Sequence, residues 1–262
     1  MLKYPRCKIN IGLHLTERRS DGFHNIETLF VDLPNIVDIL EIVEADNLSL
    51  TLSGEKIDGD SDNNLVMRAY RLLAADHRIP PAEMHLHKRI AVGTGLGGGS
   101  SDAASALILL NEFFKIGLGR DELVAYALQL GSDCPFFVYT QYEERESPSP
   151  MLACGRGEIL TPITVPQLEG AVIKLSIPPV RVSTAEAYKM VTPCIPNKSL
   201  QSLLEQPIEK WRGTIINDFE KPIFAKYPVI EAYKSRMYNQ GAIYASMSGS
   251  GSAVFGIFKT QP

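Results

Sequence analysis

The chain has 262 residues, which is enough for one large domain or two modest ones. Hydrophobic residues make up 45% and charged residues 21%, so the composition is globular and excludes a wholly disordered chain or a long coiled coil. The formal net charge of −4 repels a phosphate backbone, and this argues against nucleic-acid binding.

The cysteines show no C-x-x-C pair and no regular spacing, which fits neither a disulfide framework nor a zinc ribbon; they are Cys7, Cys134, Cys154 and Cys194. Free thiols in a reducing compartment are therefore expected. The N-terminal residues lack the apolar core and cleavage site of a signal peptide, and no run approaches the roughly 18 apolar residues of a membrane span. We expect a cytoplasmic protein without membrane contacts.

The first fifty residues are expected to form mostly β-structure. Residues 8–15 alternate, with Lys8 and Asn10 on one face and Ile9 and Ile11 on the other, which predicts a half-buried strand. After a turn signal at residues 19–22, three β-rich runs follow at 27–33, 37–43 and 48–52. Residues 65–73 have helical spacing, and a short strand is predicted over 84–90.

A glycine-rich segment, residues 93–99, opens directly into a predicted helix whose apolar residues fall on one stripe. A second helix is expected over about 120–130 and ends at Gly131. Asp133 then lies in a turn that leads into the apolar run 136–139, which we interpret as a strand.

The polar, charged segment 141–150 has no periodicity, so we place a domain boundary there, between residues 147 and 148. The second half contains predicted strands over 171–177 and 242–258, and predicted helices near 185–191, 199–205 and 223–240. Helices and strands do not alternate strictly, which indicates the α+β class.

The glycine segment is suited to phosphate, because glycines let backbone amides approach a ligand and the helix N-terminus favours an anion. A dinucleotide-binding fold requires a strand with an acidic end after the first helix, but another helix follows here. A Walker A loop fails because Gly99 occupies the lysine position, and the downstream motifs of protein kinases are absent. A capped turn without a ligand remains the structural alternative.

Several segments resemble the GHMP small-molecule kinases, whose phosphate loop is a G-L-G-x-x-S-S stretch opening a helix. Here that stretch is residues 95–101. The closer match is to the branch of the family that phosphorylates a diphosphocytidyl-methylerythritol, on the segments K-I-N-I at 8–11, D-G-F-H at 21–24 and G-S-D-C-P-F-F at 131–137. The chain departs from that pattern at Arg6-Cys7, at Ala91, and at Phe23, where a tyrosine is usual.

The resemblance implies a two-domain α+β fold of the GHMP kinase type, with an N-terminal domain like a ribosomal-protein domain and an active site in the interdomain cleft. It implies ATP and Mg²⁺ as cofactors, with Asp133 as proton acceptor and Lys8 as its partner. No residue is assigned as a metal ligand, although the hydroxyl of Ser100 or Ser101 is expected near Mg²⁺. The phosphates are expected on a loop made of Gly93, Thr94, Gly95, Leu96, Gly97, Gly98, Gly99, Ser100 and Ser101.

On the substrate side, the resemblance implies a cytidine diphosphate derivative whose base stacks between Phe23 and Tyr188, with polar contacts from His24 and Asn10. The reaction expected is phosphorylation of its 2-hydroxyl in the non-mevalonate synthesis of isoprenoid precursors. Two alternatives remain open: a sister GHMP kinase acting on homoserine or mevalonate, and a non-catalytic RNA-binding protein that shares the N-terminal fold. Oligomeric state is not predicted.

Overall fold

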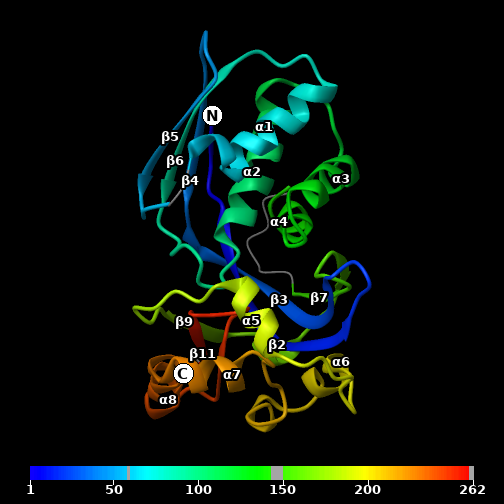
Figure 1. The fold of residues 1–262 in the computed structure, drawn as a ribbon, viewed down its shortest axis with the longest axis vertical. Coiled ribbons are helices and arrows are strands. Elements are labelled where there is room, and N and C mark those ends of the chain that lie inside the picture. The colour runs from blue at the N-terminus through cyan, green and yellow to red at the C-terminus, as the bar shows by residue number, and fades with distance from the viewer. Residues whose placement is uncertain (58–59, 143–149, 260–262) are drawn as a thin grey trace. The chain divides into compact units, whose positions relative to one another are not determined.

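The computed structural model describes residues 1–57, 60–142 and 150–259, and the chain forms two compact units (Figure 1). Unit 1 contains Met1–Lys8, Asp32–Val92 and Gly97–Pro148. Unit 2 contains Ile9–Val31, Gly93–Leu96 and Ser149–Pro262. The sequence suggested a domain boundary between residues 147 and 148. The two compact units do not follow this boundary alone, because residues 9–31 belong with the C-terminal half.

Unit 1 contains a four-stranded sheet in the order β1-β4-β6-β5. These strands are β1 (Leu2–Lys3), β4 (Ile39–Glu44), β5 (Ser49–Gly54) and β6 (Ala82–Lys88). Strand β4 pairs antiparallel with both β1 and β6, whereas β5 and β6 are parallel. The expected strands over 37–43, 48–52 and 84–90 correspond to β4, β5 and β6, with bounds shifted by a few residues.

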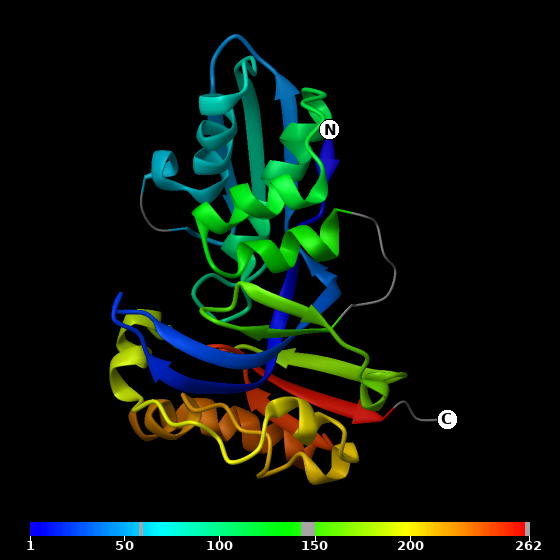
Figure 2. The same ribbon diagram turned by 90° about the vertical axis from the view of Figure 1, so that its right-hand side faces the viewer.

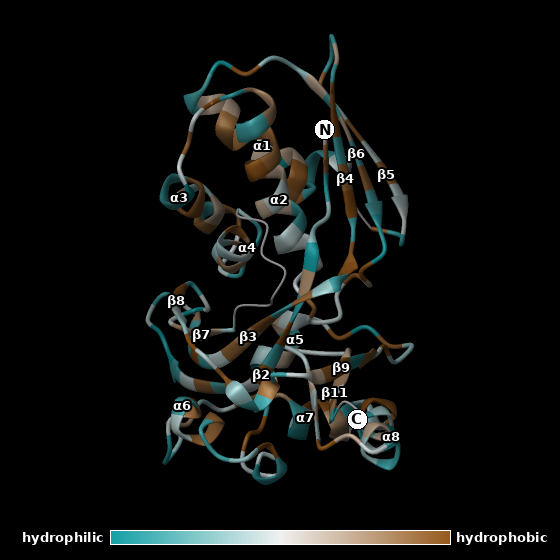
Figure 3. Cartoon of the chain, turned by 180° about the vertical axis from the view of Figure 1, so that it is seen from behind, coloured by the Kyte–Doolittle hydropathy of each residue, from teal (hydrophilic) through white to brown (hydrophobic). Residues whose placement is uncertain are grey.

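The helices of unit 1 pack around α2. They are α1 (Leu65–Asp76), α2 (Gly98–Phe113), α3 (Arg120–Leu130) and α4 (Cys134–Gln141). Every residue of α2 from 101 to 111 is buried, so this helix is covered on all sides rather than on one stripe, and Figure 3 shows hydrophobic residues along it. Because α2 packs against the other helices of unit 1, the position of its N-terminus within the unit is fixed.

Unit 2 contains two sheets, in the orders β2-β3-β7-β8 and β10-β11-β9. The strands are β2 (Arg6–Arg18), β3 (His24–Val37), β7 (Met151–Cys154), β8 (Ile159–Pro162), β9 (Ala171–Ser176), β10 (Tyr244–Met247) and β11 (Val254–Lys259); β2 begins and β3 ends in unit 1. Strand β3 pairs with β7, more than 100 residues later, and this pairing draws residues 9–31 into unit 2.

The described part of unit 2 also contains the α-helices α5 (Thr184–Met190), α6 (Leu200–Leu204), α7 (Glu220–Lys226) and α8 (Pro228–Asn239). Helix α8 packs on β10 and β11, as Figure 2 shows. The single helix expected over 223–240 is wrong, because Pro228 forces Tyr227 out of helical geometry and separates α7 from α8. In the described part of the chain, no helix is long and apolar enough to cross a membrane.

Candidate active site

The glycine-rich segment forms the N-terminus of α2. Gly97 is the N-cap residue, with a left-handed φ of 72°, and its carbonyl accepts the first helical hydrogen bond from Ser101 N–H at 2.9 Å. The N–H groups of Gly98, Gly99 and Ser100 precede that bond and have no partner within the helix. Together with the helix dipole, they form a site suited to a phosphate group.

Gly97 is confined by its neighbours in unit 1. A Cβ atom added there would lie 2.9 Å from the Phe137 ring and 3.1 Å from Lys8 Cε. By contrast, a Cβ on Gly99 would meet only Leu65, at 3.7 Å. Gly97 is therefore required by packing and φ, whereas Gly99 is exposed and leaves its backbone accessible to a ligand.

The first half of the glycine segment is held in unit 2 by the loop between β10 and β11. A Cβ on Gly95 would lie 2.1 Å from Ser248 O, and Ser248 Oγ donates to Gly95 O at 3.0 Å. The side chains of Thr94 and Leu96 are buried, so both can offer a ligand only their backbone. Asn217 Nδ2 donates to Met247 O and Gly249 O at 2.8 Å each, and it holds the loop in turn.

The two serines after the glycines differ in their surroundings. Ser101 is fully buried, and its hydroxyl accepts a hydrogen bond from Gln141 Nε2 at 2.8 Å. Ser100 is half-buried and hydrogen bonds to the thiol of Cys134. Burial raises the pKa of this thiol to about 12, so Cys134 is a neutral packing residue. Ser100 is thus the hydroxyl that a ligand can reach.

Asp133 and Lys8 meet within unit 1. Lys8 Nζ lies 3.4 Å from Asp133 Oδ2, with side-chain exposures of 4% and 30%, respectively. Lys8 comes from β2 and its stem passes Gly97, whereas Asp133 is the N-cap residue of α4. The structure therefore brings the expected ion pair to the start of α2, beside the phosphate loop.

The strand expected over 136–139 is wrong, because these residues belong to α4. Phe136, Phe137 and Val138 are fully buried, so the apolar run shows no periodicity that would distinguish a helix from a buried strand. Pro135 fits the first turn of a helix. As a result, Asp133 lies at a helix N-terminus, where the dipole stabilises its carboxylate.

The residues expected around the base lie in unit 2 but do not form one cluster. The rings of His24 and Tyr188 are 5.2 Å apart, and Tyr188 also packs on Phe219 at 4.9 Å. Phe23 is 53% exposed and lies against Arg156 instead. Burial, together with the positive charge of Arg18, lowers the pKa of His24, so its imidazole is neutral at pH 7.

Asn10 is buried, and both its side chain and its backbone form hydrogen bonds within unit 2. Its Nδ2 donates to Thr28 Oγ1 at 3.1 Å, and its backbone N–H donates to Ser248 Oγ at 3.3 Å. Asn10 therefore links β2 to β3 and to the Ser248 loop.

Sequence reasoning missed a buried charge cluster next to the phosphate loop. Lys88 Nζ bonds to Asp38 and, at 2.7 Å, to Oδ2 of Asp102, the fifth residue of α2. Asp38 Oδ1 also accepts the N–H groups of Arg89 and Ile90. Burial raises the pKa of Asp102 to about 8, against the opposing effect of Lys88. The only sequence signal was Asp102 itself, directly after the two serines.

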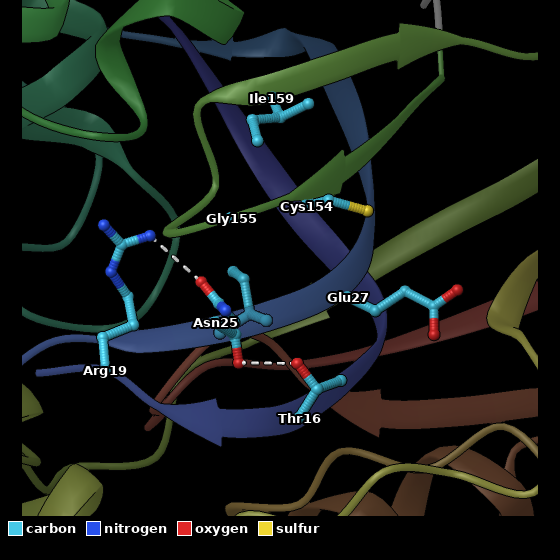
Figure 4. A pocket seen from close by; sticks show the side chains of 8 residues that line it. Thr16, Arg19, Asn25, Glu27, Cys154, Gly155 and Ile159 are labelled. Carbon is cyan, nitrogen blue, oxygen red and sulfur yellow. Dashed lines mark hydrogen bonds between the residues drawn. The ribbon is translucent and has the colours of Figure 1, made fainter.

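A separate open pocket in unit 2 has a volume of about 470 Å³ and is lined by Thr16, Arg19, Asn25, Ile26, Glu27, Cys154, Gly155 and Ile159 (Figure 4). Arg19 Nη1 donates to Asn25 Oδ1 at 3.2 Å, as the figure shows, and Glu27 Oε1 accepts Leu200 N–H at 2.9 Å. Its charged side chains are therefore engaged within the protein. None of the predicted site residues lines it.

The residues at the start of α2 fit a magnesium–nucleotide complex. Mg²⁺ at phosphoryl-transfer sites usually takes one or two protein oxygens, with phosphates and water as its other ligands. The Ser100 hydroxyl is a partly exposed oxygen beside the phosphate-binding amides. In the described ranges no group of three or more His, Cys, Asp or Glu side chains could hold a metal ion.

Comparison with known proteins identifies two family matches. Residues 64–141 match the GHMP kinases N terminal domain, and residues 199–262 match the GHMP kinases C terminal domain. A 4-diphosphocytidyl-2-C-methyl-D-erythritol kinase of Azobacteroides pseudotrichonymphae genomovar. CFP2 is 46% identical over 260 residues, covering 99% of this chain and 94% of that protein. A protein of the same name from Parabacteroides distasonis is 44% identical, covering 99% and 92%.

Solved structures give the same result. A crystal structure of a 4-(cytidine 5'-diphospho)-2C-methyl-D-erythritol kinase is 32% identical, with a TM-score of 0.78, and the match covers 98% of this chain and 90% of that one. The mevalonate kinase of Methanococcus jannaschii has a TM-score of 0.65 at 13% identity, over 99% and 90% of the two chains. The second likeness concerns the fold alone.

Proposed function

Since this chain belongs to the 4-diphosphocytidyl-2-C-methyl-D-erythritol kinases of the GHMP kinase family, we propose that it transfers the γ-phosphoryl group of ATP to the 2-hydroxyl of 4-diphosphocytidyl-2-C-methyl-D-erythritol. The observation that carries the proposal is the meeting of Lys8, Asp133 and Gly97 at the start of α2. A proton acceptor, a cation and a phosphate-binding backbone then lie together in unit 1.

Phosphoryl transfer depends mainly on positioning and on stabilisation of charge. The N–H groups of Gly98, Gly99 and Ser100, which have no partner within α2, bind phosphate oxygens, and the α2 dipole favours their negative charge. The Ser100 hydroxyl would hold Mg²⁺, which would supply the charge neutralisation that a clamp lysine gives in other loops.

Asp133 accepts the proton of the attacking hydroxyl. A carboxylate is a weak base beside an alcohol, so its main task is to hold and orient the hydroxyl until the proton is released. Lys8 is buried and directs its ammonium at Asp133 Oδ2, 3.4 Å away. It fixes the carboxylate and counters the negative charge of the reacting groups.

The cytosine is recognised by unit 2. Phe23 offers an exposed ring for stacking, and the neutral His24 imidazole, held against Tyr188, offers one donor and one acceptor nitrogen. Stacking is similar for all pyrimidines, so hydrogen bonds from His24 give the preference for cytosine. A cytoplasmic location and the 147/148 division into family domains remain predictions that accompany this proposal.

The test is an ADP-release assay on a panel of acceptors. 4-Diphosphocytidyl-2-C-methyl-D-erythritol should give rapid turnover, while homoserine and mevalonate should give background rates. Faster turnover with homoserine or mevalonate would assign the chain to a sister activity. Tight binding of single-stranded RNA at physiological salt, without ATP turnover, would support the RNA-binding alternative instead.

A further inference from the structure

We propose that Arg156 is a positioning residue for the substrate base: its guanidinium covers one face of the Phe23 ring and holds the ring so that the other face can stack on cytosine. This inference rests on the proposed function, because it assumes that Phe23 binds the base. It assigns a role to a residue that lies outside the phosphate loop and the Lys8–Asp133 pair.

The position of Arg156 follows from a tight turn between β7 and β8. Gly155 and Gly157 flank it with left-handed φ values of 67° and 115°, which only glycine adopts readily. Ile26 N–H donates to Gly155 O at 2.7 Å and so joins this turn to β3. Arg156 is therefore presented beside the hairpin tip that carries Phe23.

The guanidinium of Arg156 contacts both the Phe23 ring and the carboxylate of Glu158. Arg156 Cζ lies 5.0 Å from the centroid of the Phe23 ring, within the range of a cation–π contact. Glu158 accepts the backbone N–H of Arg156 at 2.5 Å and the Nε–H of its guanidinium at 3.4 Å. Glu158 thus orients the arginine over the ring.

The backbone of Phe23 is restrained independently of its ring. Its N–H donates to Asp21 Oδ1 at 3.1 Å, and its carbonyl accepts the N–H of Arg19 at 2.9 Å. These bonds leave the side-chain torsions free, and Phe23 as a whole residue is 53% exposed. A contact on the ring face is therefore what selects its orientation.

Such a contact matters more for phenylalanine than for the tyrosine that is usual at this position. A tyrosine hydroxyl can hydrogen bond and fix its ring, whereas phenylalanine has only its faces and edges. An unrestrained ring must lose rotamer freedom when the base binds, and this weakens binding. A cation–π contact at an exposed site corresponds to about a 2- to 5-fold change in an equilibrium constant.

The first experiment measures KM and kcat for Arg156→Ala and Arg156→Lys. Both should raise KM for 4-diphosphocytidyl-2-C-methyl-D-erythritol by about 2- to 5-fold, with kcat and KM for ATP unchanged. Lysine should not rescue, because a point-like ammonium cannot cover the ring as a planar guanidinium does. The matched control is Arg236→Ala, which removes an arginine lying 4.9 Å over Tyr233 and should leave all constants unchanged.

The second experiment combines Phe23→Ala with Arg156→Ala. Phe23→Ala alone should raise KM for the cytidine substrate, and the second substitution should then add nothing, because Arg156 acts through the ring. A further increase would show that Arg156 contacts the substrate directly and would overturn the proposal. So would an unchanged KM in Arg156→Ala, or full rescue by lysine. A normal KM in Phe23→Ala would instead overturn the base-site assignment, and with it any role for Arg156.

Discussion

Asp133 and Lys8 differ in burial, and this difference makes their roles testable. We predict that Asp133→Asn lowers turnover by about 10²- to 10⁴-fold, because the amide cannot accept the hydroxyl proton. The asparagine keeps an oxygen near Lys8 Nζ, and the position is 30% exposed, so the fold should persist. Single-turnover phosphoryl transfer, together with melting temperature, measures both effects on one preparation.

Lys8→Met provides the control for this prediction. It should lower turnover through the same transition state, and the double variant should be little worse than the poorer single variant. A purely structural ion pair would instead give variants with near-normal turnover per folded molecule and a loss of stability. A stable Asp133→Asn protein with near-normal turnover would remove Asp133 from the mechanism.

The protonation state of His24 leads to a second prediction at this scale. Burial, together with the positive charge of Arg18, lowers the pKa of His24, so the imidazole is neutral at pH 7 and gains a proton only at more acidic pH. Cytidine diphosphate should therefore compete with substrate better than uridine diphosphate at pH 7, since a buried mismatch costs about 1 to 3 kcal/mol.

Protonation removes the acceptor nitrogen of His24, so this preference should shrink as the pH falls below its pKa. Inhibition constants for both nucleotides at pH 5.5 and 7.5 check the expectation. Equal inhibition by cytidine diphosphate and uridine diphosphate at pH 7.5 would argue against a role for His24. So would a preference for cytidine diphosphate that is the same at both pH values in the wild type as well as in His24→Ala.

At the scale of elements, the glycines around the N-terminus of α2 have different roles. Gly95 is needed for folding, whereas Gly99 is needed for phosphate binding. Gly95 cannot accept a Cβ, which would lie 2.1 Å from Ser248 O, so Gly95→Ala should destabilise the protein. Gly99 has room for a side chain but lies among the phosphate-binding amides. We predict that Gly99→Val leaves the melting temperature without ATP nearly unchanged and abolishes the increase caused by ATP.

Thermal shift with and without ATP checks both variants. Gly93→Ala is a further comparison for Gly95→Ala, since both positions have a left-handed φ but no atom lies within 4 Å of a Cβ at Gly93. An unchanged ATP shift in Gly99→Val would contradict the assignment of the phosphate loop. Gly97 is unsuitable for this test, because the Phe137 ring and Lys8 leave its side chain no space.

Local patterns predicted the elements with clear periodicity or clear end signals. The alternation at 8–15 marked β2, and the glycine segment marked the start of α2. The hydrophobic pattern did not predict helix α4, because an apolar run that is buried on every side shows no periodicity. It also failed to predict the burial of Lys8 and Asn10, since alternation suggested one solvated face, whereas β2 is buried on both faces.

The assembly of the site depends on contacts between distant segments, which one sequence does not reveal. The resemblance paired Lys8 with Asp133, and the structure places them 3.4 Å apart although 125 positions separate them. Asp102 was the one local signal of the Lys88 cluster, and the contact of Arg156 with Phe23 joins two turns that lie far apart in the sequence. Likewise, the pairing of β3 with β7 could not be read from either strand alone.

For the whole molecule, ATP binding should be visible as a stability change. A ligand that binds only the folded state stabilises it by mass action, by about 2.7 kcal/mol at a concentration of 100 times Kd. For a chain of this size that corresponds to an increase in Tm of roughly 5 to 10 °C. We predict this increase with ATP and Mg²⁺, and a smaller one when EDTA removes the metal, because the loop has no clamp lysine. An equal shift with EDTA would show that the backbone amides and the α2 dipole suffice for nucleotide binding, and would contradict the role given to Ser100 and Mg²⁺.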